Sequence, residues 1–163
     1  MEFKKLIDEI AAQTELLNEL LAVLERETTE MGEVNIAAMT LSNQAKEELI
    51  GRIAERSPHI QLAVTQLAAR EGLAGATTLG TVAEHVAKKG KREILAKQQQ
   101  IRATAERVQQ VAALNREIAE RFSASVTSSL SLITRLINQS NVYGASGGYQ
   151  VRPTGAVMIN REA

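Results

Sequence analysis

One row of residues in the second half of the chain restricts the fold more than any other feature of the sequence. From Ile94 to Leu136 the row alternates spacings of four and three residues without interruption, and most of its members are apolar. Its members are Ile94, Gln98, Ile101, Ala105, Val108, Ala112, Asn115, Ala119, Phe122, Val126, Ser129, Ile133 and Leu136. This spacing places side chains on one side of an α-helix and is typical of coiled-coil packing. The row therefore predicts a helix about 65 Å long if unbroken, at ~1.5 Å per residue.

The N-terminal part of the chain provides helices on which this long helix can pack. A second 4–3 row predicts an amphipathic helix over about residues 2–29, made of Phe3, Ile7, Ile10, Thr14, Leu17, Leu21 and Leu24. Gly32 interrupts the row, and Asn35 is placed to cap a second helix. The inner face of that second helix is predicted at Ala38, Leu41, Ala45, Leu49 and Ile53.

Charge is divided between the two halves of the chain. Residues 1–79 carry 13 acidic and 7 basic side chains, a net charge of −6, and residues 80–163 carry 6 acidic and 12 basic side chains, a net charge of +6. Opposite charges favour packing of one half on the other, as in an antiparallel helical hairpin. Separate solvation of two charged surfaces is the alternative.

The middle of the sequence predicts two further helix boundaries. Proline disfavours helical geometry in the preceding residue and is favoured at the first helical position, so Ser57 and Pro58 predict a break and a restart. The restarted helix has its inner face at Ile60, Ala63, Val64 and Leu67, and Gly72 and Gly75 end it. Residues 73–80 are then a connecting loop, and the capping-box spacing of Thr81 and Glu84 predicts the next helix start.

Composition argues against catalysis. The chain contains no cysteine, which excludes disulfides, thiolate metal sites and a cysteine nucleophile. His59 and His85 lack partners at a catalytic or metal-binding spacing, and no glycine-rich phosphate loop follows a strand. No apolar run approaches ~18 residues, so no membrane insertion is expected. We therefore predict a cytoplasmic protein that is not an enzyme and has no metal and no cofactor.

The fold class predicted from these patterns is all-α, an elongated antiparallel helical hairpin or bundle with coiled-coil-like packing. Aromatic residues make up only 2% of the chain, which suits helices packed along their length better than a globular core. We expect a bundle domain over residues 1–140 and a flexible tail over residues 141–163, which hold four of the ten glycines and both tyrosines.

Three features are candidates for binding. Near the end of the long helix, apolar residues cover more than one side and need an intramolecular cover or a partner helix: Leu130, Leu132, Ile133, Leu136 and Ile137. The tail places Tyr143 and Tyr149 among glycines, either as contact residues or as incidental members of a disordered terminus. A basic run over residues 88–107 could meet phosphates, but it has no interleaved aromatics and is diluted by acidic residues. A solvated face, or pairing with the acidic first helix, is the simpler interpretation of that run.

The order of these parts resembles the FlgN family of flagellar export chaperones. The resemblance is carried by four segments: Leu16-Leu17-Asn18-Glu19-Leu20-Leu21, Ala45-Lys46-Glu47-Glu48-Leu49-Ile50, Leu114-Asn115-Arg116 and Tyr143-Gly144-Ala145-Ser146-Gly147. The last, a Tyr-Gly-x-x-Gly box beyond a long helix, is the most specific. The segment from Ser57 to Gly75 and the basic stretch from Lys88 to Arg92 depart from the family plan.

The resemblance implies a chaperone that binds hook–filament junction (hook-associated) proteins and delivers them to the export gate. It implies that the cargo's helical terminal segments lie on Leu130, Leu132, Ile133, Leu136 and Ile137, and that Tyr143, Gly144 and Gly147 contact the gate. Two alternatives come from other classes. One is a structural coiled-coil oligomer without cargo, in which the 94–136 row pairs with itself in a homodimer. The other is a helical nucleic-acid binder that uses the basic run 88–107.

Overall fold

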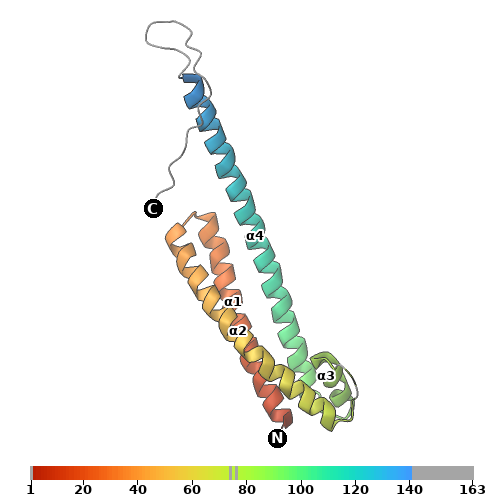
Figure 1. Ribbon diagram of the computed structural model, residues 1–163. Helices are drawn as coiled ribbons and strands as arrows, with labels where there is room; N and C mark the ends of the chain where they lie inside the picture. The colour runs from red at the N-terminus through yellow and green to blue at the C-terminus, as the bar shows by residue number, and fades with distance from the viewer. Residues whose placement is uncertain (1, 74, 76, 141–163) are drawn as a thin grey trace, which may run out of the picture. The chain divides into compact units, whose positions relative to one another are not determined.

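The computed structural model describes residues 2–73, 75 and 77–140 and folds them into four helices (Figure 1). They are α1 (Glu2–Gly32), α2 (Ile36–Arg70), α3 (Leu79–Lys88) and α4 (Glu93–Ser140). The described ranges contain no strand, which confirms the all-α class. The contacts divide the chain into two units, residues 1–119 and 120–163, so the boundary falls within α4. Each unit is described by itself, and the predicted tail 141–163 lies outside the described residues.

A tight turn joins α1 and α2 into a helical hairpin. The backbone N–H of Asn35 donates to the carbonyl of Glu30 at 2.9 Å, and the side-chain Oδ1 of Asn35 accepts from the N–H of Ala38 at 3.1 Å. The predicted N-cap is therefore confirmed, because Asn35 satisfies a backbone donor that the first turn of α2 leaves unpaired. The prediction of α1 is also confirmed, and the helix runs three residues beyond the expected end at residue 29.

The predicted break at Ser57 and Pro58 is wrong, because α2 runs unbroken from Ile36 to Arg70. The hydroxyl of Ser57 donates to the carbonyl of Ile53 at 3.0 Å, as a helical serine does, and does not cap a new helix. Proline removes the hydrogen bond to the carbonyl of Ala54, four residues earlier, and its ring crowds that carbonyl, but Ala54 and Pro58 are both exposed to solvent. Burial of Leu49 before the proline and Val64 after it holds both halves of α2 in place and outweighs the local preference.

Replacing Pro58 with alanine is therefore expected to stabilise the protein. The substitution restores a helical N–H donor at an exposed position, and proline in a helix interior costs roughly 3 kcal/mol relative to alanine. We expect the free energy of unfolding to rise by about 1–3 kcal/mol, measured by urea denaturation followed by circular dichroism. A fall in stability on this substitution would show that Pro58 is the residue that this backbone requires.

Two apolar clusters hold residues 1–119 together. The first joins all four helices and comprises Leu6, Ile10, Ala63, Val64, Leu67, Ala68, Val82, Ala83, Val86 and Ile94. The second joins α1 to α2 through Leu16, Leu20, Val23, Leu24 and Leu49, with Val108 and Val111 of α4 packed against it. Because Ile94 meets the start of α1 and Val108 meets its later turns, α4 runs in the same direction as α1. The α1–α2 turn makes α2 antiparallel to α1, and therefore also to this part of α4.

The start of α3 lies three residues before its predicted position. Thr78 is the N-cap, and its hydroxyl accepts from the N–H of Thr81 at 3.2 Å. The N–H of Thr78 in turn donates to the hydroxyl oxygen of Thr81 at 3.0 Å, so the capping box is formed by Thr78 and Thr81. The predicted pair, Thr81 and Glu84, does not open the helix, because Thr81 already fills the third helical position.

The inner face of α2 is also corrected at one position. Leu49 is 6% exposed and Ala45 and Ile53 are partly buried, as expected, but Leu41 is 66% exposed. Its neighbour Ser42 is buried instead, and its hydroxyl donates to Glu30 Oε2 at 2.7 Å. The last turns of α1 carry buried carboxylates in place of apolar side chains, so the facing position on α2 is a hydrogen-bond donor.

Candidate functional site

The α4 residues in the second unit present a continuous apolar surface. Every residue from 120 to 137 is exposed. The large apolar side chains are Phe122, Val126, Leu130, Leu132, Ile133, Leu136 and Ile137, with exposed fractions between 42% and 64%. We call these seven residues the 122–137 face. Contiguous apolar surface on a protein commonly marks a binding site, since isolated exposed leucines are ordinary but a row of seven is not.

Helical geometry places the seven residues of this face on one side of α4. At 3.6 residues per turn, Phe122, Val126 and Ile133 lie within a narrow sector of the helix surface. Leu130 and Ile137 fall on one flank of this sector, and Leu136 and Leu132 on the other. The arrangement matches a surface that receives an amphipathic helix, whose apolar side chains recur at the same spacing.

Three hydroxyl side chains of the same segment are hydrogen-bonded within the helix. The hydroxyls of Thr127, Ser129 and Thr134 donate to the carbonyl four residues earlier at 3.0, 3.0 and 2.9 Å. No charged residue occurs between Phe122 and Thr134 in the sequence. Burial of the 122–134 part of this face would therefore be mainly apolar, and the one charged residue of the 122–137 segment is Arg135.

The five cargo residues predicted from sequence are brought together on this face, since all of them are members of it. Phe122 and Val126 extend the face by two turns toward the start of α4 and were missed as site residues. The signal that would have found them is the row itself, which contains both. The three residues predicted to contact the gate, Tyr143, Gly144 and Gly147, lie outside the described residues.

The basic run 88–107 is largely engaged within the protein. Lys89 Nζ lies 2.6 Å from Glu71 Oε2, and this ammonium holds the pKa of the Glu71 carboxyl below its usual value of 4.5. Lys91 Nζ lies 5.1 Å from the centre of the Phe3 ring, and Arg107 lies 3.2 Å from Glu25 of α1. The last contact is the expected pairing with the acidic first helix.

A shallow groove in the first unit was not predicted from the sequence. Residues from α1, α2 and α4 line it, and half of them are apolar: Leu24, Met31, Met39, Ile50, Ala112 and Ala119. The polar half comprises Glu27, Asn43, Lys46, Glu47, Asn115 and Arg116. Ile50 is not a member of the predicted inner face of α2.

Among the described residues, the longest apolar stretches of helix are too short or too polar to cross a membrane.

Comparison with protein-family models gives one finding for this chain. Residues 1–150 match the family described as FlgN protein. No curated protein and no solved structure matches the chain. The matched range covers the four helices and reaches past the Tyr-Gly-x-x-Gly box.

Proposed function

The chain belongs to the FlgN family of flagellar export chaperones, and from that premise we propose that it binds hook-associated proteins in the cytoplasm and delivers them to the export gate. The observation that supports this proposal is the 122–137 face, a helical apolar surface whose large side chains are between 42% and 64% exposed. Such a surface takes up the amphipathic helical end of a cargo protein and so prevents that end from polymerising. Binding of this kind needs no nucleotide and no catalysis.

The site for cargo follows from the exposure of the side chains. Leu130, Leu132, Ile133, Leu136 and Ile137 are between 51% and 64% exposed in the free chain. Full burial of a Leu or Ile side chain contributes about 1.5–3 kcal/mol relative to exposure, so a few of these residues supply the affinity that a reversible complex needs. The cost of immobilising the partner offsets part of this gain.

The contact with the export gate is proposed for the tail. Tyr143 with Gly144 and Gly147 forms the Tyr-Gly-x-x-Gly box, which follows directly on the cargo helix in sequence. A tyrosine offers a large apolar ring and a hydroxyl with few rotatable bonds, as residues that dominate binding energies often do. Cargo and gate would then contact adjacent segments of one chain.

Two measurements test the two parts of this proposal. Each is made on the full chain and on a chain that ends at Ser140. Calorimetric titration with a purified hook-associated protein should give the same affinity for both forms. Titration with the purified cytoplasmic domain of the export gate should give binding for the full chain only. Within the full chain, Tyr143→Ala should weaken gate binding by about thirtyfold, as a contact worth roughly 2 kcal/mol predicts.

Tyr149→Ala is the matched control, because it removes the other tail tyrosine and leaves the box intact. Equal gate affinity for the truncated and full chains would overturn the tail assignment and leave the cargo assignment standing. Absence of binding between the full chain and every hook-associated protein would overturn the chaperone proposal. Salt-sensitive binding to nucleic acid, or self-association alone, would then favour one of the alternative classes.

A further inference from the structure

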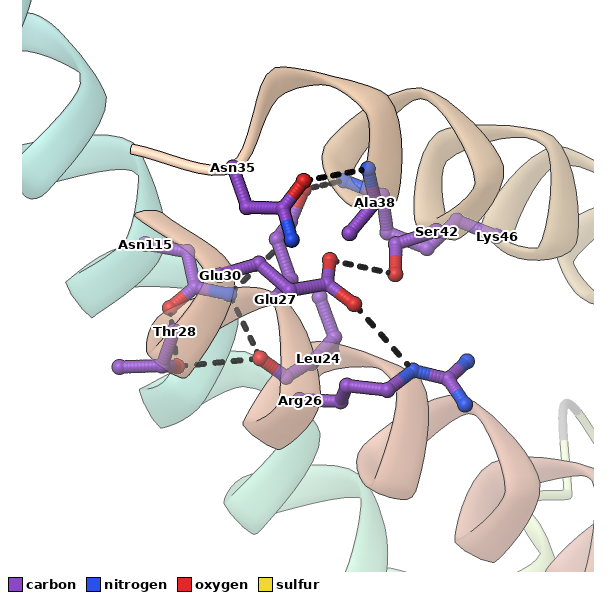
Figure 2. A network of polar contacts seen from close by, with 10 residues as sticks. All are labelled: Leu24, Arg26, Glu27, Thr28, Glu30, Asn35, Ala38, Ser42, Lys46 and Asn115. Carbon is purple, nitrogen blue, oxygen red and sulfur yellow. Dashed lines mark hydrogen bonds and ion pairs between the residues drawn. The ribbon is translucent and has the colours of Figure 1, made fainter. Parts of the chain in front are cut away.

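A buried polar network interrupts the otherwise apolar packing of α4 on α1 (Figure 2). Asn115 is 5% exposed, and its Nδ2 donates to the carbonyl of Leu24 at 2.8 Å and to Glu27 Oε2 at 2.9 Å. Its Oδ1 accepts from the hydroxyl of Thr28 at 2.6 Å. The side chain therefore uses both of its donors and its oxygen on one short stretch of α1.

The network continues from α1 to α2, so three helices share it. Glu27 is 7% exposed, and its second oxygen accepts from the ammonium of Lys46 on α2. One turn later, Glu30 accepts from Ser42 of α2 and pairs with Arg26 of α1. Each buried carboxylate thus has a donor from α2, and Glu27 has a further donor from α4. Buried charges are tolerated only with such partners.

The apolar part of the interface does not define its own register. The 94–136 row repeats every seven residues, so a shift of α4 by seven residues places one row member where another stood. Such a shift moves the helix by about 10 Å. It would bring Ile101 to the place of Ile94, and Asn115 to the place of Val108. Apolar packing alone discriminates weakly between these arrangements.

The polar network, in contrast, strongly favours the observed register of α4 over the shifted ones. In a shifted register Phe122 or Val108 would face Glu27, which would lose its Asn115 donor. Asn115 would take the place of Val108, which packs against the apolar cluster of Leu16, Leu20, Val23 and Leu24, and would lose its bonds to Leu24, Glu27 and Thr28. A buried polar group left without a partner costs about 1–3 kcal/mol, and a charged group costs more.

We propose that Asn115 is the positioning residue that fixes the register of α4 on α1. Register decides which α4 residues pack on α1 and which remain exposed, so Asn115 sets where the exposed face begins. The register itself is independent of the proposed function, and only its consequence for cargo rests on that function.

The experiment uses the absence of cysteine from the chain, which allows two cysteines to be introduced as reporters. Glu25→Cys with Arg107→Cys reports the observed register, since these side chains are 3.2 Å apart and each is about half exposed. Glu25→Cys with Leu114→Cys, or with Gln100→Cys, reports a shift of seven residues in either direction. The protein is treated with a short bis-maleimide and the cross-linked fraction is quantified by mass spectrometry.

In the protein that keeps Asn115, the 25–107 pair should cross-link, and the 25–114 and 25–100 pairs should not. In Asn115→Leu, a 25–114 or 25–100 cross-link should rise several-fold at the expense of 25–107. Val108→Leu is the matched control, because it changes another member of the row that makes no polar contact, and it should leave the pattern native. Cross-linking at 25–107 alone in Asn115→Leu would overturn the proposal.

A second variant keeps the test valid if Asn115→Leu alone does not fold. Glu27→Leu with Asn115→Leu removes both members of the buried contact, and Lys46 can turn to solvent because its side chain is 21% exposed. A fully apolar layer of this kind is often no less stable than a buried ion pair. Native cross-linking alone in this double variant, or loss of helical circular dichroism in both variants, would also overturn the proposal. Cargo affinity is measured separately, so failure of the register proposal and failure of the chaperone proposal are distinguishable.

Discussion

Replacing Ile133 and Leu136 together with aspartate should lower the affinity for a hook-associated protein at least about a hundredfold. Both side chains lie on the 122–137 face and are 51% and 64% exposed in the free chain. Their burial against a partner helix contributes roughly 1.5–3 kcal/mol each, and each ~1.4 kcal/mol is a factor of ten in the dissociation constant. Two carboxylates in an apolar interface add a desolvation cost. The affinity is measured by calorimetric titration with the purified cargo protein.

The matched control places the same two charges on the other side of the same helix. Ser128 and Ser131 are exposed and, at 100° per residue, lie opposite Ile133. Ser128→Asp with Ser131→Asp should therefore leave the affinity within a few-fold of the native value. Both variants should unfold at the native temperature, since neither changes a buried residue. Equal loss of affinity in the two variants would mean that cargo does not recognise this face.

Truncating Leu49 to alanine should destabilise the protein by about 2–5 kcal/mol. Leu49 is 6% exposed and joins the second apolar cluster, where α1 and α2 pack together. The truncation removes apolar burial and leaves a cavity that the surrounding side chains only partly fill. Chemical denaturation followed by circular dichroism gives the change in the free energy of unfolding. Because the 122–137 face contains no residue of this cluster, cargo affinity at a temperature where the variant is folded should be unchanged.

Leu41 provides a control of the same residue type on the same helix. It is 66% exposed, so Leu41→Ala should change the free energy of unfolding by less than about 0.5 kcal/mol. The sequence pattern assigns Leu41 and Leu49 to one inner face, and the structure separates them. Similar destabilisation by the two truncations would restore the sequence-based assignment and contradict the packing described above.

The long helices were predictable because their signal is local and repeated. The 94–136 row and the row over residues 3–24 each require one helical face, and neither contains a proline or a glycine. Asn35 was predictable as a cap for the same reason, since a cap depends on a few neighbouring residues. The five residues predicted to bind cargo also lie on one exposed face, although their role stays a proposal. The tail residues of the gate contact stay a prediction from sequence.

Tertiary packing decided the structure where a local sequence pattern and the tertiary contacts favoured different outcomes. Pro58 signals a break, but burial on both sides of it keeps α2 continuous. Leu41 fits the inner row, but the carboxylate of Glu30 requires a donor, and Ser42 provides it.

Sequence by itself predicted the long helices α1 and α4 and the apolar stripe of each, because periodicity acts over a few residues. It could not determine how far along α1 the α4 row is placed, because a repeat of seven residues allows several registers. Only the folded structure, in which Asn115 meets Leu24, Thr28 and Glu27, selects one of them. The physical reason is that apolar contacts are nearly interchangeable along the row, whereas a buried hydrogen bond needs its own partner at one position.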